Sequence, residues 1–258
     1  MEIDLSRLPV QTTPQGSSKC DRCKVEFAAK LLSRCGANGI FCEPCERHLF
    51  AAEQRAYRSQ ELMRKYGDLQ GRGLLRENFI QSGFNKSTQE IEALNSEAWE
   101  AAKDWNGDSN IYLYGPVGCG KSFLALSILK KVFCVTKGRD VAEIAARRFA
   151  KLSDRFDEGR GILAVLSKVN MLLIDDLDKA IWDPERLAAL WEILDDRMVG
   201  NRRTVITANV APLQLREILR AQSPGNQSLA DAALDRLKPC LTLELKGKSL
   251  RSLDRLSA

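Results

Sequence analysis

The sequence predicts an α/β domain with three layers and a mostly parallel sheet. Strand-like segments alternate with segments of helical periodicity between residues 87 and 245. Such an alternation favours parallel strands joined by crossover helices on both faces of a sheet. Residues 169–174, VNMLLI, are an uninterrupted apolar run, which is typical of a central strand buried on both faces.

Further strands and helices are expected around this central strand. The strands are placed at 110–114, 204–208 and 241–245, with the last at an edge of the sheet. Helices are placed at 87–105, 121–136 and 185–198, where apolar residues recur at helical spacing. The inward residues are expected to be Ile91, Leu94, Ala98 and Ala102 in the first helix, and Leu187, Leu190, Trp191, Leu194 and Met198 in the last.

The bulk properties indicate one ordinary domain and a smaller module. The chain has 258 residues, a formal net charge of +5 and 44% hydrophobic residues. No apolar run approaches the roughly 20 residues that span a bilayer, and the first thirty residues lack a signal-peptide pattern. We therefore expect a soluble, cytoplasmic protein with no membrane partner. The modest positive charge suits contact with nucleic acid but does not require it.

Composition divides the chain into four parts. Residues 1–18 show no periodicity and are expected to be a mobile leader. Residues 19–66 are expected to form a small metal-binding module and a helix that ends near Tyr66. Closely spaced glycines mark an expected linker at 67–76, and residues 77–258 form the α/β domain.

The cysteines are concentrated near the N-terminus. Eight cysteines in a chain that lacks a signal-peptide pattern argue against a disulfide scaffold. Four of them have the spacing Cys20-x2-Cys23-x18-Cys42-x2-Cys45. Two C-x2-C pairs are typical of a structural Zn²⁺ site with four thiolate ligands and no open position. Cys35 or the single histidine, His48, could replace one of these ligands.

A glycine-rich loop precedes the helix expected at 121–136. Residues 115–122 read GPVGCGKS, a pattern whose backbone N–H groups surround phosphates at the positive end of a helix. Lys121 is expected to reach the β- and γ-phosphates of a nucleotide, and the Ser122 hydroxyl to hold Mg²⁺. The nucleotide-binding residues expected here are Gly115, Pro116, Val117, Gly118, Cys119, Gly120, Lys121, Ser122 and Phe123.

Polar side chains also follow two of the predicted strands. Asp175 is the first aspartate of MLLIDD and the expected second Mg²⁺ ligand, and Asp176 beside it is a candidate general base for water attack. Asp176 is alternatively a turn or cap residue. Asn209 ends the strand TVITAN, where it could orient the attacking water or simply belong to a turn.

These motifs together resemble the AAA+ ATPases of the DnaC/DnaI helicase-loader group, whose broader family includes the transposon ATPase IstB. The resemblance lies in GPVGCGKS, LLIDD, Arg197 within LDDR, TVITAN and the ending LKGKSLR. It implies an AAA+ P-loop domain with a mostly parallel five-stranded sheet that binds ATP or ADP. The ending gives Gly247, Ser249 and Arg251, and the resemblance implies that Arg251 contacts the nucleotide.

The resemblance also implies assembly and DNA contact. Such ATPases assemble side by side through their AAA+ domains, and Arg236 in LDRL is the candidate finger that completes a neighbour's site. A structural pairing of Arg236 with Asp231 or Asp235 is the alternative. The basic residues Arg147, Arg148, Lys151 and Arg155 are expected on a helix that either contacts single-stranded DNA or is simply solvated.

The function implied is ATP-dependent loading of a hexameric DnaB-type replicative helicase onto single-stranded DNA. The zinc module would bind the helicase, with DNA contact as the alternative, and slow ATP hydrolysis would release the loader. One rival is an IstB-like transposition ATPase that acts on duplex DNA. The other is a nucleotide-gated adaptor with little hydrolysis, because Asp176 stands where glutamate is usual.

Overall fold

The computed structural model describes residues 17–19, 26–28, 43–86, 95–137, 140–154 and 159–247. The chain divides into two compact units, residues 1–63 and residues 64–258, and each is described by itself. In the first unit, β1 (Ser17–Lys19) pairs antiparallel with β2 (Glu26–Ala28). Helix α1 (Glu43–Gly71) begins in the first unit and ends in the second. Among the helices of these ranges, none has both the length and the apolar character that crossing a membrane requires.

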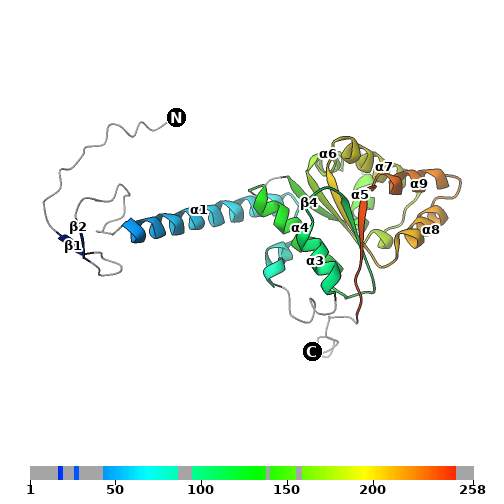
Figure 1. Ribbon diagram of the computed structural model, residues 1–258. Coiled ribbons are helices and arrows are strands. Elements are labelled where there is room, and N and C mark those ends of the chain that lie inside the picture. The colour runs from blue at the N-terminus through cyan, green and yellow to red at the C-terminus, as the bar shows by residue number, and fades with distance from the viewer. Residues whose placement is uncertain are drawn as a thin grey trace, which may run out of the picture. The chain divides into compact units, whose positions relative to one another are not determined.

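A five-stranded sheet is the centre of the second unit (Figure 1). Its strands are β3 (Asn110–Tyr114), β4 (Val141–Ala145), β5 (Met171–Asp175), β6 (Arg203–Ala208) and β7 (Cys240–Glu244). They lie in the order β4-β5-β6-β3-β7, and every neighbouring pair is parallel. The expected parallel sheet and the edge position of its last strand are confirmed. The sequence pattern did not locate β4, because Glu143 interrupts its apolar run.

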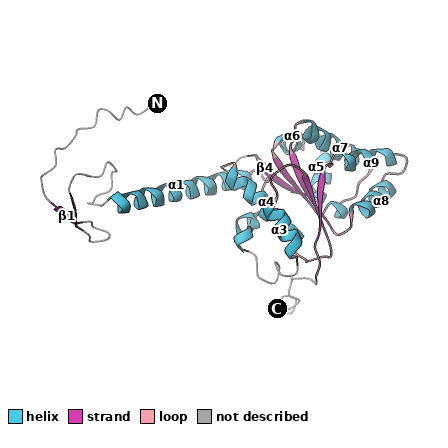
Figure 2. Cartoon of the chain, viewed as in Figure 1, coloured by secondary structure: helices cyan, strands magenta, loops and turns pink. Residues whose placement is uncertain are grey.

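Crossover connections place helices on both faces of the sheet (Figure 2). The chain passes from β3 through α4 to β4 at one edge, and each later connection runs in the opposite direction along the sheet. Right-handed crossovers of opposite direction lie on opposite faces, so α4 covers one face and the later helices cover the other. Ligands of open α/β sheets bind at the carboxyl ends of strands beside such a reversal.

The helical elements of this unit vary from single turns to long helices. Besides the end of α1 they are η2 (Glu77–Gln81), η3 (Phe84–Lys86), α3 (Ser96–Asp104), α4 (Lys121–Val135), α5 (Ala146–Ser153), α6 (Arg160–Lys168), η4 (Leu177–Lys179), α7 (Pro184–Val199), α8 (Pro212–Gln222) and α9 (Gln227–Asp235). Helices α4 and α7 match the helices expected at 121–136 and 185–198.

The buried face of α7 differs from the expected one at its last turn. Leu187, Leu190 and Leu194 are buried as expected and Trp191 is partly buried, but Met198 is 43% exposed. Arg197 takes the buried position instead, since it lies three residues after Leu194 rather than four. The expectation that Met198 faces inward was wrong. Arginine is seldom fully buried, so the sequence pattern favoured Met198 over Arg197 for the buried position.

Arg197 connects α7 to the ends of three other elements. Its guanidinium donates to the backbone carbonyls of Leu166, Val169, Asn170 and Arg203 and to the hydroxyl of Thr204. Burial lowers the pKa of this guanidinium to about 9. These acceptors replace the water that the buried guanidinium has lost, so the arginine of LDDR ties α7 to the start of β5 and β6.

Helix α3 begins later than the helix expected at 87–105. Asn95, directly before α3, has non-helical backbone angles. Its buried side-chain oxygen accepts the backbone N–H of Lys246 at 2.7 Å, and such side-chain bonds compete with helix formation. Ala98 and Ala102 are buried as expected, whereas Ile91 and Leu94 lie outside the described residues.

Helix α1 also differs from expectation, since it continues to Gly71 rather than ending near Tyr66. The Tyr66 ring is buried, and its hydroxyl donates to the carbonyls of Arg76 and Glu77 at 3.2 and 2.9 Å. A glycine costs a helix about 1 kcal/mol, which is small beside the packing of a buried tyrosine. Gly67 and Gly71 are therefore tolerated in the helix, whereas Gly73, with φ 68°, lies beyond its end.

Candidate nucleotide-binding site

The glycine-rich loop joins the carboxyl end of β3 to the first turn of α4. Gly115, Gly118 and Gly120 all have positive φ, at 146°, 83° and 100°, a region that side chains other than glycine rarely adopt. Gly120 is the N-cap of α4, and its carbonyl accepts the N–H of Leu124 at 3.0 Å. The glycine-rich loop therefore leads directly into the amino end of α4, where backbone N–H groups without a helical acceptor can bind an anion.

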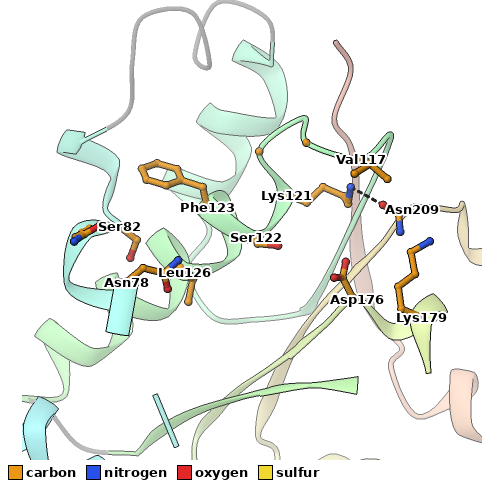
Figure 3. A pocket seen from close by; sticks show the side chains of 13 residues that line it. Asn78, Ser82, Val117, Lys121, Ser122, Phe123, Leu126, Asp176, Lys179 and Asn209 are labelled. Atoms are coloured by element: carbon orange, nitrogen blue, oxygen red, sulfur yellow. Dashed lines mark hydrogen bonds between the residues drawn. The ribbon is translucent and has the colours of Figure 1, made fainter. Parts of the chain in front are cut away.

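Lys121 lies buried under this loop, with its ammonium group turned toward β6. The Nζ atom donates to the carbonyls of Gly115 and Pro116 at 2.9 and 2.7 Å and to Oδ1 of Asn209 at 3.1 Å (Figure 3). Two of the residues expected from separate motifs are thus in direct contact, although they are 88 positions apart.

Asp175 is buried at the end of β5 and accepts two hydroxyl hydrogen bonds on one oxygen. Ser122 Oγ and Thr207 Oγ1 donate to Asp175 Oδ1 at 2.9 and 2.6 Å. Ser122 and Asp175 therefore offer adjacent hard oxygen atoms, which is the donor set that Mg²⁺ prefers. The two residues expected to hold magnesium fit that ion.

Asp176 has a left-handed backbone, with φ 57° and ψ 52°. Its N–H donates to the Thr207 hydroxyl at 2.8 Å, and its side chain lines the cavity described below. Aspartate and asparagine tolerate this conformation better than longer residues, which gives a local reason for aspartate at this position. Desolvation, with the nearby Asp175 and Asp178 carboxylates, raises the pKa of Asp176.

Asp178 is a site residue that the motifs did not reveal. Its Oδ1 and Oδ2 accept the backbone N–H and the side-chain Nδ2 of Asn209 at 3.0 and 2.8 Å. Burial alone would raise the pKa of Asp178, but hydrogen bonds from Asn209 and Lys179 outweigh it and lower this pKa. Because the Nδ2 group of Asn209 donates to Asp178, its Oδ1 faces Lys121. The only signal in the sequence is an acid two residues after Asp176.

A cavity of about 470 Å³ lies over these groups. Figure 3 shows Asn78 and Ser82 on one side of it and Asp176 and Asn209 on the other. It is lined by Asn78, Gln81, Ser82, Val117, Gly118, Gly120, Lys121, Ser122, Phe123, Leu126, Asp176, Lys179 and Asn209. Gly115, Pro116 and Cys119 belong to the loop but are not among the residues that line the cavity. No motif identified the side formed by η2, because no spacing rule links residues 78–82 to the loop.

Arg236 lies in an ion pair within its own chain. Its Nε is 2.5 Å from Asp195 Oδ1, and its guanidinium lies 5.8 Å from the centre of the Trp191 ring. The partner is therefore neither Asp231, which pairs with Arg220 and Arg216, nor Asp235, which pairs with Lys238.

Several expected site residues lie outside the described part of the chain. They are Cys20, Cys23, Cys35, Cys42, Arg155, Ser249 and Arg251. Cys45 and His48 lie on α1, and His48 is exposed. Among the residues that the structure describes, no group of three or more His, Cys, Asp or Glu side chains is placed to hold a metal ion. The zinc site stays a prediction.

We predict that Gly115→Ala destabilises the domain by about 3 kcal/mol, which combines left-handed strain with overpacking. A Cβ at Gly115 would overlap the carbonyl oxygen of Leu245, whose N–H is bonded to Tyr114 at 2.7 Å. Gly225→Ala is the matched control, because Gly225 also has positive φ but has open space around it. It should cost about 1 kcal/mol. Urea unfolding measures both, and equal losses would contradict the close approach.

Comparison with known proteins identifies the family. The sequence model of the IstB-like ATP-binding proteins matches residues 47–258, and no curated protein sequence matches the chain. The crystal structure of DnaI is similar with a TM-score of 0.53 and 20% identity, over 67% of this chain and 95% of that one. The crystal structure of the DnaC helicase loader is similar with a TM-score of 0.51 and 17% identity, over 66% of this chain and 100% of that one.

AMPPCP-bound DnaA from Aquifex aeolicus gives a TM-score of 0.50 and 19% identity, over 64% of this chain and half of that one. At these identities the structural likeness shows the fold alone. The family model, however, covers most of the chain, from within α1 to the last residue. The chain therefore belongs to the family of IstB-like ATP-binding proteins.

Proposed function

We propose that this protein is an ATP-dependent loader of a hexameric DnaB-type replicative helicase onto single-stranded DNA. The fold that it shares with DnaI and the DnaC helicase loader, over nearly the whole of both those chains, is the observation that carries the proposal. The cysteine pairs before the ATP-binding domain add a module suited to holding a partner. ATP binding would strengthen the hold on helicase and DNA, and hydrolysis would release them.

The proposed position of the nucleotide is the cavity beside the phosphate loop. Its phosphates would follow the loop N–H groups toward the start of α4, with Lys121 beside the β- and γ-phosphates. The base and sugar would lie toward Asn78, Gln81 and Ser82, with Arg251 contributing from the C-terminal end. Ser122 and Asp175 would hold Mg²⁺, which supplies positive charge against the phosphate oxygens.

Hydrolysis would depend on Asp176 and Asn209. Asp176, whose pKa is raised, would accept a hydrogen bond from the attacking water, and Asn209 would help to orient that water. Asp178 would keep the Asn209 amide in one orientation through two hydrogen bonds. Because aspartate reaches less far than glutamate, turnover should be slow, and an adaptor that binds ATP with little hydrolysis is the limiting case.

Self-assembly and DNA contact complete the proposal. To complete a neighbouring subunit's site as an arginine finger, Arg236 would exchange Asp195 for a phosphate. Helix α5 would contact single-stranded DNA through exposed basic residues, among them Arg147 and Lys151. Arg147 also donates to the Lys179 carbonyl at 3.0 Å, so DNA contact and the turn that bears Asp178 would be linked.

We predict that the N-terminal cysteines hold about one Zn²⁺ per chain, because two C-x2-C pairs supply four thiolates. Metal analysis of the purified full-length chain measures the content. The double variant Cys20→Ser, Cys23→Ser should lose the metal, whereas Cys134→Ser, which changes an exposed cysteine of α4, should keep it. A wild-type content far below one ion per chain would refute the site.

We predict that the full-length chain retains the hexameric helicase of its own source in a pull-down, more strongly with ATP than without. Lys121→Ala should remove the ATP-dependent part and leave the rest, because the lysine lies in the nucleotide site and not in the N-terminal unit. Absence of helicase in both conditions, together with tight binding of duplex DNA, would favour an IstB-like transposition ATPase instead. The family match makes that the second candidate.

A further inference from the structure

An arginine that belongs to none of the family motifs contacts the aspartate expected to bind magnesium. Arg76 lies between α1 and η2, and its Nη2 is 2.9 Å from Asp175 Oδ2. Its Nε is 2.8 Å from Glu143 Oε2, and its backbone N–H donates to Glu143 Oε1. The Arg76 side chain is 31% exposed, whereas those of Glu143 and Asp175 are 4% and 7% exposed.

The two carboxylates need a cation between them. Glu143 lies on β4 and Asp175 on the neighbouring strand β5, and the register pairs Ala145, two residues after Glu143, with Asp175. Their side chains are nearly buried, so water cannot screen the repulsion between them. The planar guanidinium of Arg76 reaches both at once, which a lysine does less well because its charge is a single point.

The two oxygens of Asp175 face different partners. Oδ2 faces the guanidinium, while Oδ1 faces the hydroxyls of Ser122 and Thr207. The carboxylate is thus held from both ends, with Oδ1 next to Ser122. We propose that Arg76 is a positioning residue for magnesium binding, which acts by fixing the orientation of Asp175. The inference rests on the proposed magnesium site at Ser122 and Asp175.

The segment that carries Arg76 is itself fixed between α1 and the sheet. The Tyr66 hydroxyl of α1 donates to the carbonyls of Arg76 and Glu77, and the Leu74 carbonyl accepts the N–H of Glu143 at 2.8 Å. The next turn, η2, supplies Asn78 and Gln81 to the cavity. One short segment therefore joins the end of α1 to both the proposed magnesium ligand and the nucleotide cavity.

A second arginine provides a matched control. Arg148 of α5 donates from Nη1 to the Gly73 carbonyl at 2.6 Å, so it holds the same segment without contacting Asp175. The readout is the ratio of the affinities for a fluorescent ATP analogue in Mg²⁺ and in EDTA, measured on the full-length chain. This ratio separates the contribution of magnesium from that of the phosphate loop.

We predict that Arg76→Gln lowers the ratio about tenfold, as expected when a residue that orients a metal ligand is lost. Arg148→Gln should leave the ratio unchanged, and Arg76→Lys should restore part of it. Thermal unfolding checks that each variant is folded. If Arg76→Gln does not fold, Arg76→Lys is compared with Arg148→Gln instead.

Three results would overturn the inference. An unchanged ratio in Arg76→Gln would show that Asp175 needs no such support, and an equal fall in Arg148→Gln would show that the segment matters rather than the guanidinium. A raised ratio would show that Arg76 competes with the cation. A wild-type ratio near one would refute the magnesium site itself. This outcome can be told apart from a failure of the Arg76 inference, because it is seen in the wild type before any substitution.

Discussion

The nucleotide site depends on one buried carboxylate, that of Asp175. A carboxylate with so little exposure requires hydrogen-bond donors or a cation, and it receives them from three separate elements: Ser122 of α4, Thr207 of β6 and Arg76 before η2. In the strand order, β6 lies between β5, which ends at Asp175, and β3, which leads into the phosphate loop. One charged group thus contacts the end of the phosphate-loop motif, strand β6 and the segment after α1.

A second network, on the β6 side, surrounds Lys121. Asp178 fixes the Asn209 amide, Asn209 accepts from Lys121, and Arg147 of α5 holds the carbonyl of Lys179. The contacts of each network share members, since Asp175 has three partners and Lys121 has three oxygen acceptors, so a ligand that drew one member away would change the contacts of the others. This arrangement suits a protein in which nucleotide binding changes the hold on a partner, as proposed for a loader.

The sequence predicted those parts of the site that lie within one motif. GPVGCGKS, LLIDD and TVITAN each carry a fixed spacing, and the structure brings Lys121, Ser122, Asp175, Asp176 and Asn209 together. The sequence alone could not predict Arg76 or Glu143. A glutamate within an apolar run indicates the end of a strand unless its partner is known, and that partner is 67 residues away. The burial of Arg197 in place of Met198 could not be predicted either, because its hydrogen-bond acceptors come from other elements of the fold. The end of α1 was misplaced because the anchor of Tyr66 is a tertiary contact.

We propose that the two networks form one site for a magnesium-bound ATP molecule. The most direct measurement is calorimetric titration of ATP in Mg²⁺ into the full-length chain, with the Lys121→Ala variant in parallel. We predict one ATP bound per wild-type chain and no measurable binding to the variant. Equal binding to both, or none to the wild type, would contradict it.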